Sequence, residues 1–121
     1  MGLLENIVYI CNHKYHDMKL IEINLHRIFE LCKRYKVKTL SVFGSILTDK
    51  FNDQSDVDLL VTFEPFDPDN PGDFDCVSNY FGLKEAFEKL FNRQVDLIEE
   101  DALKNKYFIR NVNRTKQVIY G

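Results

Sequence analysis

Two hydrophobic runs, each bounded by polar residues at one end, constrain the fold of this chain more than any other feature. The first, Val37–Phe43, stops at Gly44-Ser45. After ten intervening residues, the second run opens as Asp56-Val57-Asp58-Leu59-Leu60-Val61. Short runs that are rich in Val, Leu and Phe and end at such breakers favour buried strands. Because side chains alternate along a strand, we expect Asp56 and Asp58 on one face of a sheet.

The rest of the chain predicts helices that alternate with these strands. Apolar residues three and four apart predict amphipathic helices over 21–35 and 80–91. A third strand is expected over 94–98, and Asp101 is expected to cap a last helix that ends near Arg110. The remaining expectations are a short helix over 46–50, the second strand over 56–63, a loop at Pro65, Pro68 and Pro71, and a final strand or docked tail over 118–120. The predicted fold class is α/β (α+β), a small mixed β-sheet flanked by helices.

Two further expectations concern the extent of the domain and its core. Residues 1–19 carry no clear pattern and are interpreted as an N-terminal extension, with one domain over 20–121. The chain of 121 residues is long enough to bury a core of its own. Four aromatic residues of the second amphipathic segment are expected in that core: Tyr80, Phe81, Phe87 and Phe91.

Composition narrows the classes of partner and compartment. The net charge of −3 argues mildly against a nucleic-acid-binding protein, which usually presents a basic face. No apolar stretch approaches the roughly 18 residues that a membrane-spanning helix needs. Cys11, Cys32 and Cys76 match no redox or zinc pattern, and an odd number without a recognisable signal peptide favours a reducing compartment. We therefore expect a cytoplasmic protein that does not bind a membrane.

The polar residues around the two runs suggest phosphate and metal chemistry. Gly44 allows a tight turn, Ser45 offers a hydroxyl donor, and a helix that follows would aim free N–H groups at an anion. Asp56 and Asp58 on one strand face repel each other unless a cation lies between them, and Mg²⁺ prefers such oxygen ligands. Taken singly, most Gly-Ser pairs are ordinary turns and most aspartates at strand ends are solvated.

Asp96 repeats this pattern on the third predicted strand. It lies within Val95-Asp96-Leu97-Ile98, again a carboxylate inside a short apolar run. Three carboxylates on neighbouring strands would be able to hold metal ions and activate a hydroxyl. An edge-strand aspartate that faces water is an equally good interpretation of Asp96 alone.

Together these residues resemble the minimal nucleotidyltransferase family of the DNA polymerase β-like superfamily. The likeness covers about residues 20–120 and combines Phe43-Gly44-Ser45 with Ser55-Asp56-Val57-Asp58-Leu59-Leu60-Val61. It implies the polymerase β-like nucleotidyltransferase fold and the transfer of a nucleoside monophosphate, AMP from ATP, to an acceptor hydroxyl. By motif position it implies that Gly44 and Ser45 hold the triphosphate. It further implies that Asp56, Asp58 and Asp96 are the catalytic and Mg²⁺-binding carboxylates.

The segment after Gly44-Ser45 departs from the family pattern. Many relatives carry arginines there, whereas this chain has Ile46, Leu47, Thr48 and Asp49, and Lys50 is the first cation available for the nucleotide. Family members of this size often act as antitoxins that adenylylate a HEPN-domain toxin, which the resemblance implies as a partner. The missing arginines motivate one alternative, a binding module that neutralises its partner by occlusion. A second alternative is a nucleotidyltransferase for a small, antibiotic-type molecule, which an acceptor pocket within the chain would favour.

Overall fold

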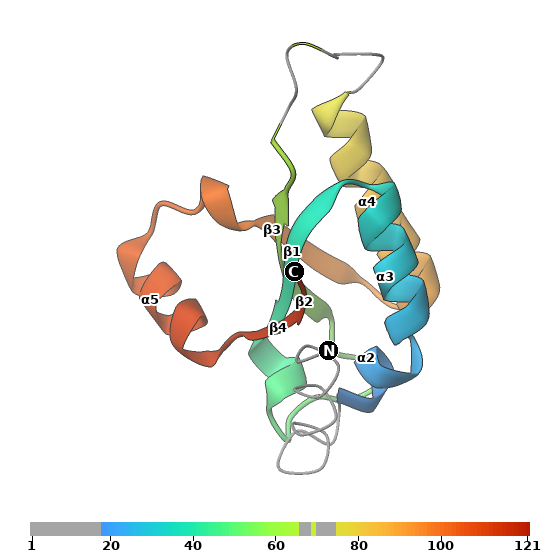
Figure 1. Cartoon of the computed structure of the whole chain (residues 1–121). Helices are drawn as coiled ribbons and strands as arrows, with labels where there is room; N and C mark the ends of the chain where they lie inside the picture. The colour runs from blue at the N-terminus through green and yellow to red at the C-terminus, as the bar shows by residue number, and fades with distance from the viewer. Residues whose placement is uncertain (1–17, 66–68, 70–74) are drawn as a thin grey trace.

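The computed structural model describes residues 18–65, 69 and 75–121 and contains one mixed sheet with helices on both faces (Figure 1). The helices are α2 (Lys19–Ile23), α3 (Leu25–Arg34), α4 (Cys76–Phe91) and α5 (Lys106–Thr115), with short 3₁₀ helices at Gly44–Leu47 and Glu100–Ala102. The strands are β1 (Val37–Phe43), β2 (Val57–Phe63), β3 (Val95–Glu99) and β4 (Gln117–Tyr120), in the spatial order β3-β2-β1-β4. This confirms the predicted α+β fold with a small mixed sheet.

The sheet combines antiparallel and parallel pairs. β1 runs antiparallel to both β2 and β4, whereas β2 and β3 are parallel, with α4 in the connection between them. A parallel pair needs such a crossover, because a tight hairpin reverses the chain direction. The 118–120 segment is therefore a strand, paired with β1 at the edge opposite β3.

The main core lies between the sheet and the layer formed by α2, α3 and α4 (Figure 1). Alternate residues of β1 and β2, such as Leu40, Val42, Leu59 and Val61, meet the buried faces of these helices, including Phe87. The period of two in the strands and the three- and four-residue spacing in the helices thus bury one continuous apolar layer.

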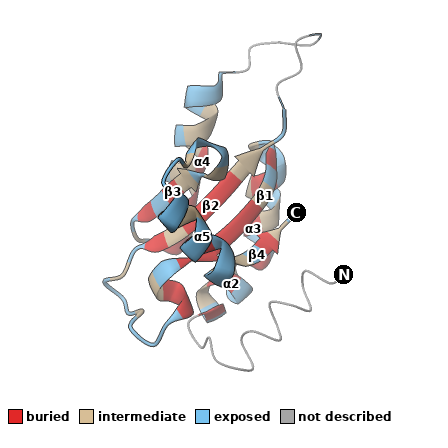
Figure 2. Cartoon of the chain, turned by 90° about the vertical axis from the view of Figure 1, so that its left-hand side faces the viewer, coloured by how far each residue is buried: buried red, intermediate tan, exposed pale blue. Residues whose placement is uncertain are grey.

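The opposite face of the sheet is covered in part by α5. Phe43, Leu60 and Val112 form a smaller buried cluster there, and the Phe43 and Phe108 rings meet edge to face with centroids 6.0 Å apart. Figure 2 views the molecule from this side, with the buried strands behind an α5 whose outer surface is exposed. Asp58 and Asp96 lie on this less covered face.

Several element boundaries differ from the predictions, and side-chain capping explains most of them. The predicted helix over 21–35 is divided at Asn24, whose side-chain amide donates to the Leu20 carbonyl at 2.8 Å and competes with the regular pattern. α4 begins four residues earlier than predicted because the Asp75 carboxylate accepts from the Val77 N–H. The predicted cap at Asp101 is wrong: Asn105 caps α5 by accepting from Tyr107 and Phe108.

Two expectations about single segments are also corrected. The predicted helix over 46–50 is instead the four-residue 3₁₀ helix Gly44–Leu47. The Gly-Ser turn is therefore not followed by an α-helix whose N-terminus would face a ligand. Phe81, expected in the core, is 58% exposed, whereas Phe87 and Phe91 are buried and Tyr80 is partly buried. Phe81 faces outward because the apolar stripe of α4 runs through Leu83 and Phe87.

The N-terminal boundary of the domain stays a prediction, because residues 1–17 lie outside the described part of the chain. Met18, the first described residue, is fully buried in the main core. Among the described helices, none is both long and apolar enough to cross a membrane.

Candidate active site

Gly44 turns the chain directly against the Asp58 carboxylate. Gly44 has φ of +76°, a conformation that side chains other than glycine rarely adopt. A Cβ atom at this position would lie 2.3 Å from Oδ2 of Asp58, which leaves no room for any side chain. The neighbouring Ser45 N–H donates a hydrogen bond to the same carboxylate. The Gly-Ser turn and the second strand, which are separate in sequence, therefore form one site.

The strand register brings Asp96 beside Asp58. Asp58 is the partner of Phe43 on β1 and of Asp96 on β3, so the two carboxylates project from the same face of adjacent strands. Asp56 lies just before β2 and is exposed, as is Asp96, whereas Asp58 is half-buried. The three predicted carboxylates are thus gathered in one region of the sheet.

Their proximity has an electrostatic consequence. Burial is the main factor that raises the pKa of Asp58 to about 6, and the negative charges of Asp96 and Asp56 raise it further, in that order. The hydrogen bond from the Ser45 N–H opposes the shift by favouring the ionised carboxylate. A site where like charges disfavour ionisation is one that a divalent cation would stabilise.

The donor set fits a metal ion that takes its remaining ligands from a substrate. Within the described residues, no three acidic, histidine or cysteine side chains are arranged to hold a metal ion between them. Mg²⁺ is commonly held by one or two carboxylates together with substrate phosphates, so Asp56 and Asp58 satisfy the protein's share of such a site. The assignment of Asp56, Asp58 and Asp96 as metal ligands stays a prediction.

The first residues after Gly44-Ser45, where the resemblance implied arginines, have packing and turn-closing roles in this structure. Ile46 and Leu47 are buried in the main core, so these two positions supply packing instead of cations. Thr48 closes the turn by donating its hydroxyl hydrogen to the Ser45 carbonyl at 2.8 Å. Asp49 and Lys50 are exposed, and neither the Lys50 ammonium nor the Ser45 hydroxyl has a hydrogen-bond partner among the described residues. Both groups are therefore available to a ligand.

Arg93 organises the loop before Asp56, a role that sequence reasoning missed. Its Nη1 donates to the carbonyls of Asn52 and Ser55, both at 3.0 Å, and its guanidinium lies 4.8 Å from the centre of the Phe51 ring. Arg93 sits in the turn that leads into β3, so it links the loop that ends at Asp56 to the strand that carries Asp96. The available signal was an arginine two residues before a buried strand, which is weak by itself.

Tyr80, on α4, contacts β3 one residue beyond Asp96. Its hydroxyl donates to the Leu97 carbonyl, and burial, followed by the charges of Asp96 and Glu99, raises the pKa of this hydroxyl. Tyr80 also lines a pocket of about 320 Å³ at the β3 edge, together with Cys76, Val77, Phe81, Glu99 and Ala102. This hollow borders the strand of Asp96 but contains none of the predicted site residues.

The chain is similar in sequence to a known domain family and to two named relatives. The family model described as a nucleotidyltransferase domain matches residues 27–119. A candidate protein adenylyltransferase of Methanocaldococcus jannaschii, MJ1379, is 34% identical over 79 residues, which cover 65% of this chain and 73% of that protein. The protein adenylyltransferase MntA of Thermococcus cleftensis is 33% identical over 76 residues, 63% of this chain and 69% of that protein.

Solved structures share the fold. A candidate minimal nucleotidyltransferase superposes with a TM-score of 0.63 at 26% identity, over 81% of this chain and 91% of that one. A toxin-antitoxin crystal structure with AMP-PNP has a TM-score of 0.61 at 18% identity, over 81% of this chain and 73% of that one, a likeness of fold alone. With the family model covering most of the chain and the Gly-Ser turn facing the carboxylates, the chain belongs to the nucleotidyltransferase domain family of enzymes.

Proposed function

We propose that the protein is a Mg²⁺-dependent protein adenylyltransferase that transfers AMP from ATP to a hydroxyl of a HEPN-type toxin and thereby acts as its antitoxin. The observation that carries the proposal is the contact between the Gly44-Ser45 turn and Asp58. This contact sets a phosphate-binding turn against a carboxylate whose neighbours are also acidic. A triphosphate with its metal ion supplies both the anion that the turn would bind and the cation that the carboxylates would bind.

In this proposal the predicted residues divide into those that bind the triphosphate and the three carboxylates that serve the metal ion and the acceptor. The Ser45 hydroxyl and the Lys50 ammonium bind triphosphate oxygens, while glycine at position 44 lets the phosphates approach the backbone. Asp56 and Asp58 hold Mg²⁺, which neutralises phosphate charge when it is bound. The acceptor oxygen forms a bond to the α-phosphorus as the bond to pyrophosphate breaks, and Asp96 completes the metal site or accepts the acceptor's proton.

The acceptor in this proposal is a protein hydroxyl. Two pockets of the described part lie between α3 and α4 and at the β3 edge, and neither is lined by Gly44, Asp56 or Asp58. The relatives named as protein adenylyltransferases and the toxin-antitoxin structure with AMP-PNP support the same class of acceptor. The free thiols of Cys32 and Cys76 agree with a cytoplasmic location; Cys11 lies outside the described residues.

The test is transfer of label from α-labelled ATP to a purified HEPN-type partner in the presence of Mg²⁺. We expect labelled partner with the parent protein and a loss of at least about 100-fold with Asp58→Ala, since a metal ligand is removed. Asp49→Ala, an exposed change in the neighbouring turn, is the matched control and should keep the rate. Equal labelling by Asp58→Ala and parent would contradict the metal role of Asp58.

The burial of Ile46 and Leu47 favours one alternative, neutralisation by occlusion without turnover. The two side chains cannot bind phosphate, so fewer cations face the nucleotide than in relatives with arginines there. Under this alternative, Asp56→Ala and Asp58→Ala would still neutralise the partner while no label is transferred. Under the leading proposal, both variants lose neutralisation together with transfer.

A further inference from the structure

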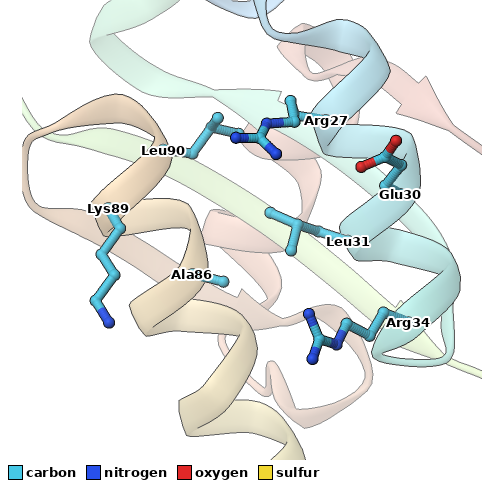
Figure 3. A pocket seen from close by; sticks show the side chains of 7 residues that line it. All are labelled: Arg27, Glu30, Leu31, Arg34, Ala86, Lys89 and Leu90. Atoms are coloured by element: carbon cyan, nitrogen blue, oxygen red, sulfur yellow. The ribbon is translucent and has the colours of Figure 1, made fainter.

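A groove on the helix layer lies on the side of the sheet opposite to the carboxylates. It has a volume of about 410 Å³ between α3 and α4 and is lined by Arg27, Glu30, Leu31, Arg34, Ala86, Lys89 and Leu90. Figure 3 shows Leu31 and Ala86 facing each other across it, with the Arg27 and Arg34 side chains reaching from α3 toward α4 on either side of Leu31. The groove therefore has an apolar floor between two guanidinium groups.

The charge of this groove is locally basic in a chain whose net charge is −3. The Glu30 carboxylate lies 3.0 Å from Nε2 of His26, and Lys89 pairs with Glu85 at 3.4 Å. Neither Arg27 nor Arg34 has an ion-pair or hydrogen-bond partner within the described residues, and the Arg34 guanidinium lies 6.0 Å from the centre of the Tyr35 ring. The two guanidiniums are thus the groups that an incoming acidic surface would meet.

Their spacing defines the shape of that surface. Arg27 and Arg34 are seven residues apart on one helix, a rise of about 10.5 Å. A helix laid along the groove would present carboxylates at positions i and i+7 to these arginines. An apolar residue at i+3 or i+4 of the same helix would then rest on Leu31, Ala86 and Leu90.

We propose that the α3/α4 groove is a docking site for an acidic amphipathic helix of a partner protein. A second copy of this chain does not supply the occupant from its described helices: α3 holds one acidic residue, α5 holds none, and α4 has no two carboxylates seven residues apart. The apolar floor favours a protein over the evenly charged backbone of a nucleic acid. Because the groove lies on the side of the sheet opposite to the carboxylates, a partner bound there leaves the Gly44–Asp58 site open. The inference therefore does not depend on adenylyl transfer.

The test uses a dye-labelled, helix-stapled peptide of about 15 residues with Glu at i and i+7 and Leu at i+3 and i+4. Fluorescence anisotropy with the full chain at low salt should give micromolar binding. The double change Arg27→Gln and Arg34→Gln should weaken it roughly tenfold, because both charge contacts with the peptide carboxylates are lost. Both positions are exposed, so the fold should survive, as circular dichroism can verify.

Matched controls decide whether the groove itself is responsible. Arg110→Gln with Arg114→Gln removes two exposed cations of α5, on the other face, and should leave the affinity unchanged. A peptide with Gln in place of Glu, or with Ser in place of Leu, should bind more weakly. Equal weakening by the α5 variant would overturn the proposal. So would tighter binding of a single-stranded DNA of equal charge, or self-association of the chain that Arg27→Gln and Arg34→Gln abolish.

Discussion

Gly44 is the residue on which the geometry of the site depends most directly. Gly44→Ala introduces strain at φ of +76° and a contact of 2.3 Å with Asp58 Oδ2. We expect a loss of about 1–3 kcal/mol in unfolding free energy, measured by urea denaturation. Mg-ATP affinity should fall roughly tenfold or more by calorimetry, because Asp58 must move. Asp49→Ala is the control, and unchanged affinity in Gly44→Ala would mean that this contact does not position the nucleotide.

The raised pKa of Asp58 predicts how the stability of the fold depends on pH in the absence of divalent cations. Its pKa is raised from 3.8 to about 6, so the folded protein binds more protons than the unfolded chain between these values. The stabilisation from protonated Asp58 is therefore complete below about pH 4 and is lost as the pH rises through about 6. Above that pH, ionised Asp58 destabilises the fold.

Asp58→Asn should remove this pH dependence. In EDTA at pH 7 the variant should be more stable than the parent by roughly 1 kcal/mol. This is less than the full rise of the Asp58 pKa from 3.8 to about 6 would give, because the carboxylate is partly exposed to solvent. Thermal melts of both proteins between pH 4 and 7.5 measure the difference. Parallel curves for parent and variant would show that Asp58 titrates normally.

At the scale of elements, Arg93 holds the loop that positions Asp56. Arg93→Met keeps an apolar side chain over Phe51 but loses both hydrogen bonds to the Asn52 and Ser55 carbonyls. We expect a loss of about 1–3 kcal/mol in unfolding free energy. Amide exchange over residues 52–57 should accelerate, and more Mg²⁺ should be needed for half-maximal nucleotide binding, because Asp56 is less well held.

The comparison that isolates this effect is a change at an arginine remote from the loop. Arg110→Met, on the exposed side of α5, should leave exchange over 52–57 and the Mg²⁺ requirement unchanged. Protection of the loop that is as strong in Arg93→Met as in the parent would contradict the role given to Arg93.

At the scale of the whole molecule, nucleotide binding should stabilise the fold by mass action. At a Mg-ATP concentration of 100 times Kd, the gain is about 2.7 kcal/mol, which for a domain of this size raises Tm by about 10 °C. Differential scanning fluorimetry with ATP and Mg²⁺ measures the shift. Asp56→Ala and Asp58→Ala should show little shift, and a full shift in both would place the nucleotide elsewhere.

Local patterns in the sequence determined the strands, the main helices, and the candidate residues Gly44, Ser45, Asp56, Asp58 and Asp96. These follow from periodicity and residue type, which act over a few neighbours in the chain. Boundaries failed where a cap decided them, as with Asn105 in place of Asp101, because several nearby polar residues compete for one helix end.

Only the tertiary structure decided how these residues meet. The pairing of β2 with β3 sets Asp96 beside Asp58, and the turn at Gly44 excludes a side chain next to Oδ2 of Asp58. The Arg93 bonds and the basic α3/α4 groove join segments far apart in the chain, so no local pattern signals them. Register and packing are set by burial across the whole sheet, and the site depends on them as much as on its residues.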